Sequence, residues 1–68
     1  MFYFFQRGAE YIRCEINESD GGFVIIITDP KGTTRTERLE TSNDVQVRFE
    51  EIQADFRSDG WWGPHGRE

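Results

Sequence analysis

The segment at residues 23–28, Phe-Val-Ile-Ile-Ile-Thr, constrains the fold more than any other part of the chain. Successive residues of a β-strand point to opposite faces of the sheet, so this run presents apolar side chains on both faces. A strand of this kind is typical of the middle of a sheet, where other elements cover both of its sides. We therefore predict a central strand here.

Turn signals on both sides of this segment predict hairpins. Asp20-Gly21 is a preferred two-residue hairpin turn, and Gly8-Ala9 offers another. Asp29-Pro30-Lys31-Gly32 places Pro and Gly where a turn favours them. These turns divide the first part of the chain into four predicted strands, at residues 2–7, 10–18, 23–28 and 33–39.

A helix is predicted over residues 42–58. Thr41 is a candidate N-cap and Asp44 its capping-box partner, while Gly60 is a candidate stop signal. One apolar stripe follows the helical repeat, and it consists of Val45, Phe49, Ile52 and Phe56. Three charged residues lie away from this stripe: Arg48, Glu51 and Asp55. Residues 60–68 are predicted to form a tail.

These elements predict a single α+β domain over residues 1–68. We expect a four-stranded antiparallel meander in the order 1-2-3-4, with one C-terminal amphipathic helix packed on one face. Tight turns place the following side chains together on the helix face: Tyr3, Phe5, Ile12, Cys14, Ile16, Phe23, Ile25 and Ile27. The register of the fourth strand stays open, because a bulge at Gly32 would exchange its two faces.

The opposite face of the sheet carries a second set of apolar residues: Phe2, Phe4, Tyr11, Val24 and Ile26. One helix cannot cover both faces, and an exposed apolar patch usually marks an interaction site. We therefore predict a homodimer, with another protein as the alternative partner. The two faces could pack together, or the aromatic first strands could pair edge to edge.

The adjacent tryptophans Trp61 and Trp62 are added to this predicted interaction set. Large rings flanked by Gly and Pro suit a recognition segment. The alternative is a tail that folds back and supplies burial to a small domain.

No residue pattern points to catalysis, a cofactor or a metal. Cys14 is the only cysteine, so a disulfide within the chain is excluded, and its place on the apolar face suits an inert thiol. His65 lacks a second histidine or a nearby cysteine that would complete a metal site. Glu50, Glu51 and Asp55 fit the solvated side of the helix. We predict a non-enzymatic protein.

The net charge of -5 argues against generic nucleic-acid binding, because an acidic chain repels phosphates. The alternative function is single-strand binding on the aromatic face, helped by Arg13, Arg35 and Arg38. No apolar run is long enough to span a membrane, and a lone cysteine suits a reducing compartment. We therefore predict a cytoplasmic protein without a membrane partner.

The chain resembles a group of short, uncharacterised bacterial proteins. Four features carry the resemblance: an aromatic N-terminal strand that ends in Gln6-Arg7-Gly8, the turn Asp29-Pro30-Lys31-Gly32, the amphipathic helix, and the tail Trp-Trp-Gly-Pro-His-Gly-Arg at residues 61–67. The resemblance implies no known activity. The predicted order of elements is also similar to that of the Pur-alpha and Whirly-like single-strand binders, and this similarity implies no site residues.

Overall fold

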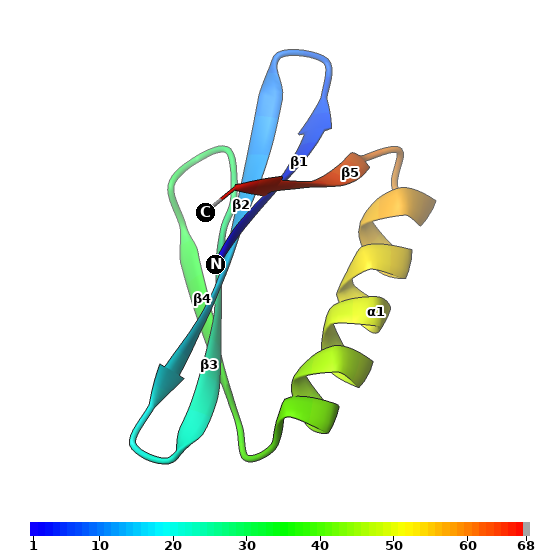
Figure 1. Cartoon of the computed structure of the whole chain (residues 1–68). Helices are drawn as coiled ribbons and strands as arrows, with labels where there is room; N and C mark the ends of the chain where they lie inside the picture. The colour runs from blue at the N-terminus through cyan, green and yellow to red at the C-terminus, as the bar shows by residue number, and fades with distance from the viewer. Residues whose placement is uncertain (68) are drawn as a thin grey trace.

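A computed structural model describes residues 1–67 as one helix on a five-stranded antiparallel sheet with the strand order β4-β3-β2-β1-β5 (Figure 1). The α+β class and the four-stranded meander are confirmed, and a fifth strand is added to them. The elements are β1 (Phe2–Arg7), β2 (Glu10–Ser19), β3 (Gly22–Thr28), β4 (Thr34–Leu39), α1 (Ser42–Ser58) and β5 (Trp62–Arg67).

The first two hairpins have the predicted tight turns. Gly8-Ala9 joins β1 to β2, and Arg7 pairs with Glu10 on its two sides. Asp20-Gly21 joins β2 to β3, and both residues have positive φ angles, 49° and 77°. Asp-Gly favours this geometry because Asp tolerates the left-handed region and Gly has no Cβ.

The third turn fixes the register of β4. The Oδ1 atom of Asp29 accepts hydrogen bonds from the backbone N–H groups of Lys31 and Thr33, both at 2.9 Å, and Gly32 has a φ of 88°. Ile25 consequently pairs with Glu37. Because Ile25 faces the helix, Glu37 also lies on the helix face of the sheet.

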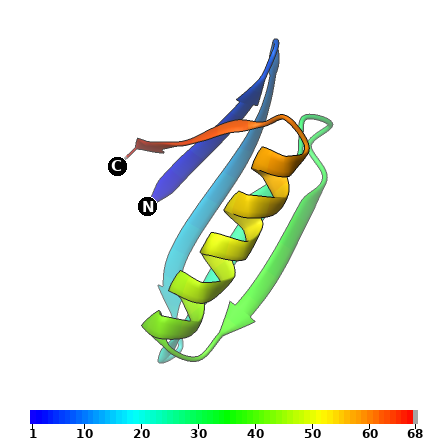
Figure 2. The same ribbon diagram turned by 90° about the vertical axis from the view of Figure 1, so that its right-hand side faces the viewer.

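The helix starts as predicted and its apolar stripe packs on the sheet, but Arg48, which was expected away from this stripe, is partly buried against Glu37. The Thr41 hydroxyl accepts a hydrogen bond from the Asp44 N–H at 3.1 Å, which confirms the N-cap. Ile52, in the middle of the apolar stripe, is buried, and its neighbours on the stripe pack around the same core. Figure 2 shows α1 lying across a single face of the sheet.

The end of the helix directs the tail back onto the sheet. The Trp61 N–H donates to the Phe56 carbonyl at 2.9 Å, and the Gly60 N–H donates to the Arg57 carbonyl at 3.1 Å. These two bonds form a Schellman motif, with Gly60 at a φ of 86°. The chain therefore reverses at Gly60, and Trp61 packs beside the last turn of the helix.

The prediction of an irregular tail over residues 60–68 is wrong, because β5 forms there and pairs antiparallel with β1. Glu68 lies outside the described residues. Gly and Pro argued against a strand here, but the β1–β5 pairing shifts register between Phe4–His65 and Gln6–Trp62. The shift leaves Gly63 and Pro64 in a bulge, a position where strands tolerate both residues. The helix is consequently not the last element.

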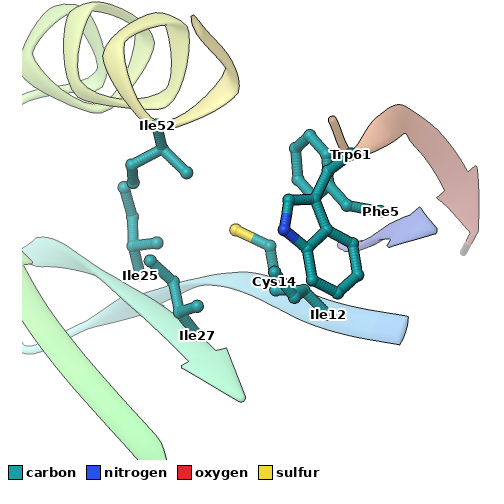
Figure 3. Packing of buried hydrophobic residues seen from close by; sticks show 7 residues of the cluster. All are labelled: Phe5, Ile12, Cys14, Ile25, Ile27, Ile52 and Trp61. Carbon is teal, nitrogen blue, oxygen red and sulfur yellow. The ribbon is translucent and has the colours of Figure 1, made fainter. Parts of the chain in front are cut away.

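The core lies between the sheet and α1 (Figure 3). Its buried side chains come from the first three strands, the helix and the start of the tail: Phe5, Ile12, Cys14, Ile25, Ile27, Ile52 and Trp61. The ring centroids of Phe5 and Phe56 lie 4.9 Å apart, and those of Tyr3 and Phe49 lie 4.8 Å apart. Within residues 1–67, α1 lacks the length and apolar character needed to cross a membrane.

Candidate interaction surface

The face of the sheet opposite α1, called the open face here, carries the five apolar residues that the sequence placed there: Phe2, Phe4, Tyr11, Val24 and Ile26. Within residues 1–67, α1 is the only helix, and it lies on the other face (Figures 1 and 2). Four of the five are half-buried among their neighbours on the sheet, while Tyr11 is 54% exposed.

The open face is not a single apolar patch, contrary to the prediction. Glu15 pairs with Phe2 on one side and with Ile26 on the other, so its carboxylate separates the aromatic residues of β1 from the aliphatic residues of β3. Arg13 occupies the corresponding place between Phe4 and Thr28. A ridge of polar side chains therefore runs along β2, the middle strand of the sheet.

A shallow groove lies on the aromatic side of this ridge. It has a volume of about 630 Å³, and it is lined by Phe2, Phe4, Tyr11 and Arg13. The guanidinium carbon of Arg13 lies 4.5 Å from the centroid of the Phe2 ring, a cation–π geometry. The Nη2 atom of Arg13 also lies 3.3 Å from a carboxylate oxygen of Glu15. The groove is therefore lined by aromatic rings and by the guanidinium of Arg13, which Phe2 and Glu15 hold in place.

His65 extends the same surface. It pairs with Phe4 across β1 and β5, and with Phe4, Gln6 and Tyr11 it lines a second groove that shares two residues with the first. Sequence reasoning treated His65 as an isolated tail residue. Its position depends on β5 pairing with β1, which no local pattern indicated.

The structure separates the two tryptophans. Trp61 is 5% exposed and belongs to the core. It therefore supplies burial to the domain, as the alternative interpretation of the tail proposed, and it is removed from the predicted interaction residues. Arg7 reinforces this position, because its guanidinium carbon lies 4.4 Å from the Trp61 ring and its Nη1 donates to the Asp59 carbonyl at 3.0 Å. Trp62 is 76% exposed on the edge strand β5 and stays available to a partner.

One predicted route to a dimer is closed. Edge-to-edge pairing of the first strands requires a free edge on β1, but β1 pairs with β2 on one side and with β5 on the other. The edges of the sheet are β4 and β5. Packing through the open face remains as the route that uses the aromatic residues of β1.

Cys14 has the surroundings of an inert thiol. It is fully buried, and burial together with the negative charge of Glu37 raises the pKa of its thiol to about 11. Residues 1–67 contain no group of three or more His, Cys, Asp or Glu side chains arranged to hold a metal ion.

Comparisons with protein-family models, curated proteins and solved structures found no match to this chain. The resemblance to short bacterial proteins therefore stays a prediction.

Proposed function

We propose that the protein is a small non-enzymatic binding module that forms a homodimer through its open face. One observation carries this proposal: a single helix covers one side of the sheet, while Phe2, Phe4 and Tyr11 remain on the other side. Aromatic side chains are enriched at protein interfaces, where they supply much of the binding energy.

The size of the chain supports the same proposal. A domain of about 60 residues buries only about 60% of the surface of its unfolded chain, so its stability is marginal. A second copy over the open face would remove further apolar surface from water. The single unpaired cysteine fits a reducing compartment such as the cytoplasm.

A pair of matched substitutions tests the proposal. Phe4→Thr keeps a residue that strands favour but removes an aromatic ring from the open face. Val47→Thr is the control, because Val47 is 51% exposed on the helix and lies outside the open face. Light scattering after size exclusion should show that Phe4→Thr weakens the dimer by at least about tenfold, while Val47→Thr leaves it unchanged.

Folding must be checked separately, because Phe4 is half-buried within its own chain. Circular dichroism reports whether each variant keeps its secondary structure. Tyr11→Thr provides a second test, since Tyr11 is more than half exposed and contributes less to the fold. If both open-face variants fold and associate as tightly as the wild type, the proposal fails.

Single-stranded nucleic acid is the second candidate partner. The Arg13–Phe2 contact at the aromatic groove favours it, because bases stack on rings and arginine binds phosphate. Arg35, which was expected to help Arg13, pairs with Ile27 and therefore lies on the helix face instead. The net charge of -5 disfavours it. Quenching of tyrosine and tryptophan fluorescence by an oligonucleotide, weakening steeply with salt, would support this function. Unchanged fluorescence at low salt would exclude it.

A further inference from the structure

We infer that the two copies pack with their β2 strands antiparallel across a two-fold axis, so that Arg13 of each copy faces Glu15 of the partner subunit. This inference rests on the proposed homodimer and specifies its geometry. When two open faces pack with their β2 strands superposed, the two polar ridges meet at the centre of the interface.

The strand register defines two neighbouring rows across the open face. One row contains Phe2, Glu15 and Ile26, and the other contains Phe4, Arg13 and Thr28. Aligned sheets pack with their strands within about 30° of each other, so rows on the two copies can lie opposite one another. A two-fold packing has two simple orientations, with the axis either across the strands or along them.

An axis across the strands, passing between the two rows, places each row over the other row of the second copy. The backbone position of Arg13 then lies opposite Glu15 of the partner subunit twice, and Phe2 lies opposite the partner subunit's Phe4 twice. In the single chain the Arg13 guanidinium contacts Glu15 and Phe2 of its own copy, so in this dimer it exchanges those contacts for Glu15 of the partner subunit. Each charge on the ridge meets an opposite charge, and aromatic rings meet aromatic rings. The interface therefore has electrostatic complementarity and an apolar region of its own.

An axis along β2 gives the opposite result. Each row then lies opposite the same row of the second copy. Arg13 faces Arg13 of the partner subunit, and Glu15 faces the partner subunit's Glu15. Like charges placed opposite each other across an interface repel, and only the Arg13–Glu15 pair within each copy offsets this repulsion. The charge pattern of β2 therefore selects the antiparallel packing.

Two charge-reversal variants test this arrangement. Arg13→Glu gives two acidic side chains on the ridge, and Glu15→Arg gives two basic ones. Each variant alone would place like charges opposite each other in the antiparallel dimer, so each should associate at least about tenfold more weakly than the wild type. An equimolar mixture of the two variants restores opposite charges at both positions and should associate with the wild-type affinity.

Sedimentation velocity measures association of the wild type, of each variant and of the mixture, and thermal unfolding of dilute samples checks that each chain folds. Variants that associate as tightly as the wild type would overturn the antiparallel arrangement and leave the dimer standing. A mixture that associates more tightly than the wild type would also overturn it, because that result requires like charges to oppose each other in the wild type. A monomeric wild type would instead remove the proposed function itself.

Discussion

Arg48 of α1 donates two hydrogen bonds to the carboxylate of Glu37 on β4, from Nε at 2.7 Å and from Nη2 at 3.0 Å. Both side chains are partly buried between the helix and the sheet. The bidentate geometry is the strong form of an arginine–carboxylate pair. This pair therefore links the edge strand β4 to the helix. The link matters because β4 has few apolar side chains that could pack against the helix.

Glu37 should make the stability of the fold depend on pH. Hydrogen bonding to Arg48 lowers the pKa of Glu37 below its ordinary value of 4.5. A lowered folded-state pKa contributes stability that is complete above the unfolded-state pKa and is lost as the pH falls through the folded-state value. Glu37→Gln should lower the free energy of unfolding at pH 7 by about 1 to 2 kcal/mol, and the difference from the wild type should vanish in strong acid.

The matched control is Glu51→Gln, because Glu51 also contacts Arg48, at 3.4 Å, but is exposed. Exposed pairs on a helix contribute only about 0.3 to 0.5 kcal/mol. Urea denaturation at several pH values measures both variants. An equal effect of the two substitutions would show that the Glu37 pair has no special role.

The two tryptophans should respond differently to substitution. Trp61→Ala removes a buried indole and should cost about 3 to 5 kcal/mol, whereas Trp62→Ala should change the stability of the single chain by less than about 0.5 kcal/mol. Because Trp61→Ala can unfold a marginal domain completely, Trp61→Phe serves as the milder variant. Urea midpoints measure these effects, and equal midpoints for Trp61→Phe and the wild type would contradict the core position of Trp61.

Gly63 should tolerate no side chain. Its φ is 141°, and a Cβ at this position would lie 2.7 Å from the carbonyl oxygen of Phe4. Gly32 is the control, since its φ is also positive, at 88°, but a Cβ there would meet nothing within 4 Å. Gly32→Ala should cost about 1 kcal/mol, and Gly63→Ala should cost at least about 2 kcal/mol. Equal urea midpoints would show that β5 does not approach β1 as described.

Cys14 should be unreactive in the folded protein. At pH 8 a thiol with a pKa of about 11 is almost entirely protonated, and burial also excludes the reagent. An aromatic disulfide reagent should therefore react with Cys14 only after urea is added. Rapid reaction in buffer without urea would contradict the buried position.

The sequence predicted most of the fold because its signals are local. Asp20-Gly21 fixes a hairpin by its own φ preferences, and Thr41 caps a helix whose apolar stripe repeats at regular spacings. The strand β5 could not be predicted in this way. It pairs with β1, which is distant in the sequence, and Gly63 and Pro64 lie in a bulge of that pairing, so the local residues gave no sign of a strand.

The candidate surface was predicted only in part, because some of its features are local and others depend on strand pairing. Alternation along β1 and β3 placed Phe2, Phe4 and Ile26 on the open face. The separation of these residues by Glu15 required the pairing of three strands to be considered together. Trp61 was misplaced because composition cannot tell a buried tryptophan from an exposed neighbour.

Sedimentation equilibrium of the wild-type protein at tens of micromolar tests the central claim, that a second copy covers the open face. The account predicts an apparent mass of twice the 8.0 kDa of one chain. A mass of 8.0 kDa at every concentration would contradict it.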